Sequence, residues 1–233
     1  MSESVEGPVS VRTGPSFYRS GQAQSWLLRL CERLAYILVM ADPARRRATY
    51  QDVLRAPENK VAEVIDHELY LSPRPGSRHA HAASSLGIKL GAPFMFGGGG
   101  PGGWIILDEP ELHLGREPAI LVPDLAGWRR ERMQLAEEVA YFTIAPDWVC
   151  EVLSPSTGRL DRAQKLPLYG AEGVRHAWLV DPSQRTLEVY RNESGRWLLL
   201  ATHAEATRVR AEPFEAVELE LGALWTDAPA REG

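Results

Sequence analysis

The stretch PDWVCEVLSPSTGRLDRAQKLPLYG, residues 146–170, decides the expected fold of this chain. Its apolar start predicts a buried strand, and the residues after the SPSTG loop have helical spacing. Pro167 disturbs the last turns of that helix, and Gly170 or Gly173 ends it. A strand joined through a loop to a helix is a unit of layered folds built around a sheet.

A second Pro-Asp pair lies upstream in AILVPDLAGW, residues 119–128, and follows another aliphatic run. If the two runs form neighbouring strands, the carboxylates of Asp124 and Glu151 project at the same edge of the sheet. Two such oxygen ligands, completed by water and a phosphate oxygen, suit Mg²⁺ or Mn²⁺ better than zinc. Such an ion polarises a phosphoryl group and lowers the pKa of a bound water.

The helix offers a cation for the same site. Asp161, Lys165 and Tyr169 follow one another at four-residue spacing, so they share one helix face. Lys165 on that face would stabilise negative charge that develops on a phosphate. A simpler interpretation stays open, in which Asp161 and Lys165 form a surface ion pair worth only about 0.3–0.5 kcal/mol.

The flanking segments predict a mixed α/β or α+β fold with a central sheet. Helices are expected at residues 49–57, capped by Thr49, and at residues 77–94, capped by Ser77. A hairpin is expected with its turn at Asp66-His67. The runs that predict strands are residues 104–114, 119–128, 147–153, 176–182, 186–191 and 196–203.

Composition is that of a globular chain, with 44% hydrophobic and 24% charged residues. The net charge of -5 argues against tight non-specific binding to DNA, although local basic patches still meet phosphates. Cys31 and Cys150 match no zinc spacing, and no secretory signal is evident, so a cytoplasmic location is expected. Residues 26–40 predict an amphipathic docking helix that is too short and too charged to span a membrane.

Several blocks of the sequence resemble one known family. They are AEVIDHELYLSPRPGSRHA, PELHL, VPDLAGWRRERM, PDWVCEVLSPSTGRLDRAQKLPLYGAEGV and HAWLVDPSQRTLEVY, and together they span roughly residues 49–203. They resemble the Uma family, a branch of the PD-(D/E)XK nuclease-like superfamily. The resemblance implies a restriction-endonuclease-like αβββαβ core with a central mixed sheet, placed in residues 48–226. Residues 1–47 are then a partly disordered N-terminal extension that carries the amphipathic helix, and residues 227–233 a C-terminal tail.

The resemblance also nominates catalytic residues. Asp124 matches the first acid of the superfamily and Glu151 the second, both as metal ligands. The usual pattern has a lysine two positions after the second acid, where this chain has Leu153. In the family the lysine lies on the following helix, which nominates Lys165.

Further positions are accessory candidates. His79 and Glu111 match other family positions, and for His79 a structural hydrogen bond is an equally open interpretation. Candidates for contact with phosphates are four basic residues near the acids: Arg129, Arg130, Arg159 and Arg162.

The activity that the resemblance implies is a Mg²⁺- or Mn²⁺-dependent endonuclease that hydrolyses DNA phosphodiester bonds. A homodimer is expected of a nuclease that cuts two strands, although no residue demonstrates one. No helix-turn-helix, zinc finger or basic zipper accompanies the sequence. Two alternatives stay open: a non-catalytic interaction or nucleic-acid-binding protein that keeps the nuclease-like scaffold, and a metal-binding protein with a substrate other than DNA.

Overall fold

The computed structural model describes residues 46–135 and 138–226, and the description below concerns the unit that begins at Arg47. The amphipathic helix expected at residues 26–40 and the tail at residues 227–233 lie outside the described residues. The domain boundary at residues 47–48 therefore stays a prediction.

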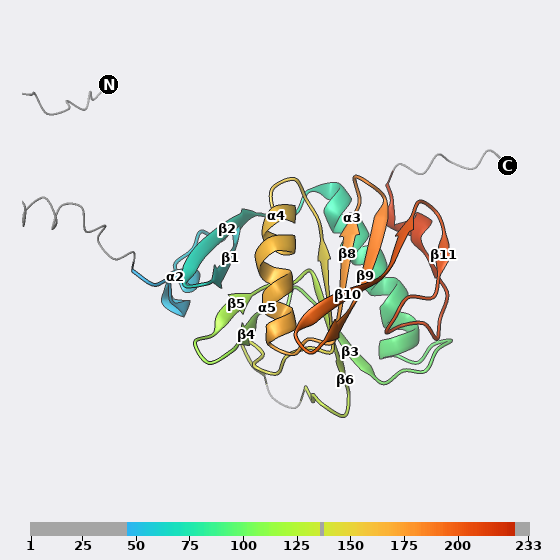
Figure 1. Cartoon of the computed structure of the whole chain (residues 1–233), viewed down its shortest axis with the longest axis horizontal. Helices are drawn as coiled ribbons and strands as arrows, with labels where there is room; N and C mark the ends of the chain where they lie inside the picture. Colours follow the sequence, from blue (N-terminus) through green and yellow to red (C-terminus); the bar gives the residue numbers. More distant parts are fainter. Residues whose placement is uncertain (1–45, 136–137, 227–233) are drawn as a thin grey trace, which may run out of the picture. The chain divides into compact units, whose positions relative to one another are not determined.

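A six-stranded sheet forms the centre of this unit, in the order β10-β9-β8-β7-β6-β3 (Figure 1). Its strands are β3 (Trp104–Asp108), β6 (Leu125–Arg129), β7 (Trp148–Val152), β8 (His176–Asp181), β9 (Thr186–Glu193) and β10 (Arg196–Ala204). Neighbouring strands are antiparallel except β7 and β8, which are parallel. The predicted mixed sheet is confirmed. A parallel pair needs a crossover connection, and here the connection is helical.

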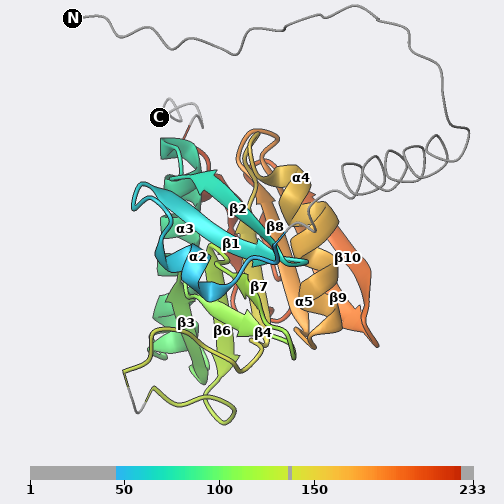
Figure 2. The same ribbon diagram turned by 90° about the vertical axis from the view of Figure 1, so that its left-hand side faces the viewer.

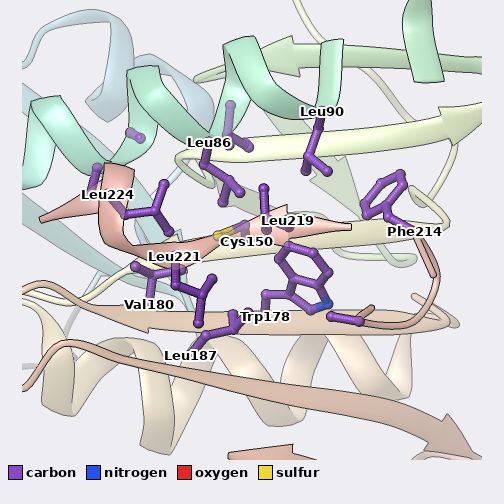
Figure 3. Packing of buried hydrophobic residues seen from close by; sticks show 14 of the residues in the cluster. Leu86, Leu90, Cys150, Trp178, Val180, Leu187, Phe214, Leu219, Leu221 and Leu224 are labelled. Atoms are coloured by element: carbon purple, nitrogen blue, oxygen red, sulfur yellow. The ribbon is translucent and has the colours of Figure 1, made fainter. Parts of the chain in front are cut away.

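Helices cover the two faces of this sheet. On one face lies α3 (Ser77–Leu90), whose Leu86 and Leu90 pack over Cys150 and Trp178 (Figure 3). The other face is covered by the crossover, which consists of α4 (Gly158–Leu160), the π-helical turn η2 (Asp161–Lys165) and α5 (Leu166–Ala171). The order α3-β3-β6-β7-crossover-β8 reproduces the expected αβββαβ core.

Alternation along β7 decides which face receives Glu151. Cys150 and Val152 belong to the apolar core beneath α3, whereas Val149 belongs to the core that contains Tyr169 of α5. Because successive side chains of a strand point to opposite faces, Glu151 points to the same side as Val149. Glu151 therefore faces the crossover helices.

A second, four-stranded sheet has the order β2-β1-β5-β4. Its strands are β1 (Lys60–Ile65), β2 (Glu68–Pro73), β4 (Leu112–Leu114) and β5 (Ala119–Leu121). The expected hairpin is confirmed, since Asp66 and His67 connect β1 to β2 with φ of 49° and 65°. Two consecutive residues in the left-handed region suit the tight turns of two-residue hairpins. Figure 2 shows β1 and β2 in front of the central sheet.

Two expected strands were wrong in extent, because each run divides between the two sheets. Residues 104–114 contain β3 and β4, separated at Glu109 and Pro110, where Glu109 has a φ of 43°. Residues 119–128 contain β5 and β6, separated by residues 122–124. Proline removes a ladder donor, so a strand rarely continues through it. Asp124 consequently lies in the link between the two sheets.

The predicted helices are confirmed with local corrections. Helix α2 (Tyr50–Leu54) begins after Thr49, which forms a capping box with Asp52. The cap of α3 is Gly76, so the prediction of Ser77 was wrong by one residue. In the crossover, the N–H of Leu166 bonds to the carbonyl of Asp161, which widens the helix by one residue. Such π-turns are frequent at functional sites.

The remaining short elements are η1 (Gly91–Met95), β11 (Arg208–Val209), β12 (Leu219–Glu220) and η3 (Leu221–Leu224). Within residues 46–135 and 138–226, no helix is both long enough and apolar enough to cross a membrane.

Candidate functional site

Asp124 and Glu151 meet at the junction of β6 and β7. The antiparallel register pairs Leu125 with Cys150, so the next pair outward is Asp124 and Glu151. Oδ2 of Asp124 accepts a hydrogen bond of 2.6 Å from the N–H of Val152. The structure therefore brings the two sequence-nominated acids side by side, with Glu151 inside β7 rather than after its end.

Lys165 lies on η2, and its ammonium points at a group of carboxylates. Nζ lies 2.8 Å from Oε1 of Glu151, 3.0 Å from Oε1 of Glu63 and 3.7 Å from Oδ1 of Asp161. It also donates to the carbonyl of Val122 at 3.4 Å. An ammonium carries three donors, so these acceptors occupy all of them.

Burial separates this group from an ordinary surface ion pair. The side chains of Lys165, Asp161 and Glu63 are each 4% exposed, and that of Glu151 is 5% exposed. The surface interpretation of Asp161 and Lys165 is therefore wrong. Buried charges persist only when they are paired and hydrogen-bonded, and here the single lysine supplies the positive charge for three acids.

Glu63 was not found by sequence reasoning. It lies on β1, in the smaller sheet, and its Oε1 also accepts a hydrogen bond of 2.9 Å from the N–H of Val122. One signal was present, because Glu63 interrupts the apolar run VAEVI that forms the buried part of this strand. An acid in such a run needs a partner inside the protein.

Glu151, Asp161 and Lys165 have shifted pKa values. Burial raises the pKa of Glu151 well above its usual range, and this effect outweighs the opposing charge of Lys165. Burial lowers the pKa of Lys165, but the carboxylates of Glu151 and Glu63 raise it by more than burial lowers it. The pKa of Lys165 therefore lies well above its ordinary value. Burial, partly offset by Lys165, raises the pKa of Asp161 to about 6.

Tyr169 completes the contacts of Glu151. Its hydroxyl donates a hydrogen bond of 2.7 Å to Oε1 of Glu151, and both side chains are buried. Burial and the neighbouring Glu151 raise the pKa of Tyr169 well above its ordinary value. The hydroxyl therefore stays protonated and holds the carboxylate in one orientation.

His79 reaches Asp124 from the first turn of α3. Its Nε2 lies 3.2 Å from Oδ1 of Asp124, and its side chain is 12% exposed. Burial lowers the pKa of His79, but the hydrogen bond and charge of Asp124 raise it above the ordinary value. The structure places this accessory candidate in contact with the first acid.

Glu111 lies elsewhere. Its Oε1 is 2.8 Å from Nε2 of His113, whose ring stacks on Tyr141 at a centroid distance of 3.7 Å. This group lies beside β4 and does not line the cavity above Asp124 and Glu151. The geometry gives Glu111 no contact with the two acids.

The four arginines nominated for phosphate contact also lie outside that cavity. Arg162 forms a bidentate ion pair with Glu188, with N–O distances of 2.6 and 3.0 Å. The guanidinium of Arg129 lies 4.1 Å from the ring centre of Trp104. Arg130 donates to the carbonyl of Met95, and Arg159 is exposed on α4. The arginines that do line the cavity are Arg74 and Arg78.

A cavity of about 480 Å³ opens above the acids. Its floor contains Glu63, Asp124, Glu151 and Lys165, and His79 lies in its wall. Residues 72–78, residues 153–157 and the pair Pro182-Ser183 form the rest of the lining.

The donor chemistry fits a hard divalent cation held by two carboxylates. Among the residues that the structure describes, no group of three or more His, Cys, Asp or Glu side chains is arranged to hold a metal ion. The bonds to Lys165 and Tyr169 use Oε1 of Glu151, and the bond to Val152 uses Oδ2 of Asp124. Oε2 of Glu151 takes no part in these bonds, and Oδ1 of Asp124, which lies 3.2 Å from Nε2 of His79, keeps a further lone pair. One oxygen of each acid can therefore bind a cation such as Mg²⁺, which protein sites often hold through one or two carboxylates plus water and phosphate.

The sequence profile of the Uma2 family, described as "Putative restriction endonuclease", matches residues 48–223. The chain belongs to the Uma2 family. The resemblance seen in the sequence blocks is thereby confirmed, and the acids and the lysine described above all lie within the matched part of this Uma2 protein.

A solved structure similar to this Uma2 protein is a crystal structure of "a putative nuclease belonging to DUF820" from Anabaena variabilis. The two chains are 22% identical, and the match has a TM-score of 0.58 and covers 76% of this chain and 97% of the other. At this identity the likeness establishes a shared nuclease-type fold and no more. No curated protein sequence matches the chain significantly.

Proposed function

We propose that this Uma2 protein is a divalent-metal-dependent nuclease that hydrolyses phosphodiester bonds of DNA. The observation that carries the proposal is the adjacency of Asp124 and Glu151 across β6 and β7, at the floor of a cavity and beside the buried ammonium of Lys165. Membership of a family of restriction-endonuclease type supports the same activity.

Asp124 and Glu151 would hold Mg²⁺ or Mn²⁺ through one oxygen each. When bound, the cation would supply Lewis acidity at the phosphate and an acidified water for attack. The protein fixes both ligands beforehand: Val152 and His79 orient Asp124, while Tyr169 and Lys165 orient Glu151. Such supporting bonds tune the affinity of a metal site.

The negative charge of the cavity floor favours the binding of a cation before the substrate. Glu63, Asp124, Glu151 and Asp161 lie around the single ammonium of Lys165. A polyanionic substrate would meet net negative charge in a poorly solvated cavity, where repulsion is weakly screened. We therefore assign Lys165 the role of holding Glu151 and balancing its charge.

The activity is tested by incubating the protein with plasmid, linear and single-stranded DNA in Mg²⁺ and in Mn²⁺. Asp124→Asn and Glu151→Gln keep the shape of the acids but remove their charge, and each is expected to lower the cleavage rate by about 100-fold or more. Glu193→Gln, an exposed acid on β9, is the matched control and should cleave at the wild-type rate. Cleavage that survives both site variants would overturn the proposal.

One observation favours a second candidate function, a nucleic-acid-binding protein that does not cut. The three donors of Lys165 are all taken by protein acceptors, so the ammonium is not free to contact a phosphate. In that case DNA binds in the presence of Mn²⁺, but no product forms with any of the three substrates.

A further inference from the structure

The charged groups of the proposed site lie deep. The side chains of Glu151 and Lys165 are 5% and 4% exposed, and that of Asp124, the most accessible of the three, is 15% exposed. A phosphate that is cleaved here must therefore enter the cavity, because these carboxylates do not rise to the molecular surface.

The cavity has a volume of about 480 Å³. Pockets of about 300–1,000 Å³ are typical of small-molecule sites, so one nucleotide of an unpaired chain matches this size. A phosphate within a duplex would be held away from the floor by its neighbours and by the opposite strand.

The rim of the cavity contains several prolines. It comes from three separate segments, and each contributes proline, at Pro73, Pro75, Pro155 and Pro182. The ring of proline fixes φ and reduces the freedom of the chain around it. In the second segment the hydroxyl of Ser154 bonds to those of Ser156 and Thr157, both at 2.9 Å.

The lining also includes residues of types that can contact the backbone of a nucleic acid. They are Ser72, Ser77, Ser156, Arg74 and Arg78, of which Arg74 also lies 3.4 Å from Glu109. Such groups bind phosphate and sugar without reading sequence. Among the described residues that line the cavity there is no Phe, Tyr or Trp on which a base could stack.

From the depth and volume of the cavity and the residues of its rim we infer that the substrate is an unpaired nucleic-acid strand, which enters the cavity one nucleotide at a time. The inference rests on the proposed nuclease function. A nuclease of this kind selects the form of its substrate and needs no base-reading module. It also cuts one strand, which removes the reason for expecting a homodimer.

The test uses oligonucleotides of one sequence in three forms: single-stranded, blunt duplex, and duplex with an unpaired flap. With Mn²⁺, the single strand should be cut about tenfold faster than the duplex or more, and the flap substrate should be cut only in its unpaired part. Duplex cleavage at an equal or higher rate would overturn the inference and leave the nuclease proposal standing. Absence of cleavage in every form, with both Mg²⁺ and Mn²⁺, would overturn the nuclease proposal and the inference with it.

A steric variant tests the entrance directly. Ser156 is exposed on the rim, so Ser156→Trp should obstruct entry and lower single-strand cleavage about tenfold without changing the thermal midpoint. Ile88→Trp, at a position 73% exposed on α3 and outside this cavity, is the control and should cleave like the wild type. Wild-type rates in Ser156→Trp would show that the strand does not pass this rim.

Discussion

The ammonium of Lys165 lies 2.8 Å from Oε1 of Glu151, and the two side chains are 4% and 5% exposed. One residue comes from a π-helical turn and the other from the middle of the central sheet. A buried pair of this kind adds little net stability over apolar residues, but the loss of one partner leaves an unpaired charge inside the protein. The contact between Lys165 and Glu151 therefore affects both the stability of the fold and the position of Glu151 in the proposed site.

Lys165→Met should destabilise the protein strongly, because Glu63, Glu151 and Asp161 lose their shared cation. The expected loss in the free energy of unfolding is about 3–5 kcal/mol, measured by urea denaturation at pH 7. Adding Glu151→Gln to Lys165→Met should recover part of that loss, since one uncompensated charge is removed. If the free energy of unfolding of Lys165→Met lies within about 1 kcal/mol of the wild-type value, the lysine is not needed for charge balance.

Asp161 should make the stability of the protein fall as pH rises from 4 to 6. Its pKa is raised to about 6 in the folded protein, so between its unfolded pKa of about 3.9 and this value the folded state binds more protons. The stabilisation is complete below the unfolded pKa and is lost by the time pH exceeds the folded one, at a cost of about 3 kcal/mol. Asp161→Asn should flatten this dependence in urea titrations at pH 4, 5, 6 and 7. An unchanged slope would contradict the shifted pKa.

His79 should act on the metal site through Asp124, whose Oδ1 lies 3.2 Å from Nε2 of the imidazole. Removing a supporting bond of this kind typically lowers metal affinity about 10–100-fold. His79→Ala should show such a loss for Mn²⁺ in calorimetry, and His79→Gln, which restores an N–H donor, should recover part of it. Equal affinities in the two variants would mean that the hydrogen bond does not position Asp124.

Tyr169→Phe removes the hydroxyl that donates to Glu151 at 2.7 Å in a fully buried position. Oε1 of Glu151 then keeps only its contact with Lys165, and the loss of a buried hydrogen bond to a charged group should cost about 1–3 kcal/mol in the free energy of unfolding. Tyr190→Phe is a matched control, because Tyr190 donates to Glu188 at 2.6 Å and Glu188, like Glu151, has a basic partner, but Tyr190 is only partly buried. Measured by denaturation, Tyr169→Phe should lose more free energy of unfolding than Tyr190→Phe. Equal losses would show that burial does not strengthen the hydrogen bond of Tyr169.

Local pattern predicted much of the site because the decisive spacings lie within single elements. Four-residue steps put Asp161, Lys165 and Tyr169 on one helix face, and the run that contains Glu151 forms β7 as expected. These relations depend on helix and strand periodicity, which a sequence displays directly. The expected pairing of the run before Asp124 with β7 was wrong, because that run forms β5 of the smaller sheet and β7 pairs with β6, which follows Asp124.

The rest depended on how distant segments meet. Glu63 belongs to a different sheet, and its approach to Lys165 follows from packing that no local period encodes. Arg162 was expected near a phosphate, but Glu188, 26 residues later, pairs with it instead. The division of residues 104–114 between two sheets follows from a break at Glu109 that the hydrophobic pattern alone did not show.

Calorimetric titration with Mn²⁺ tests most directly whether Asp124 and Glu151 hold a divalent cation. The wild-type protein and the control Glu193→Gln should each bind Mn²⁺ at one site, and Asp124→Asn and Glu151→Gln should each lose that binding. Binding that is equally tight in Asp124→Asn, or no binding to the wild-type protein, would contradict the account.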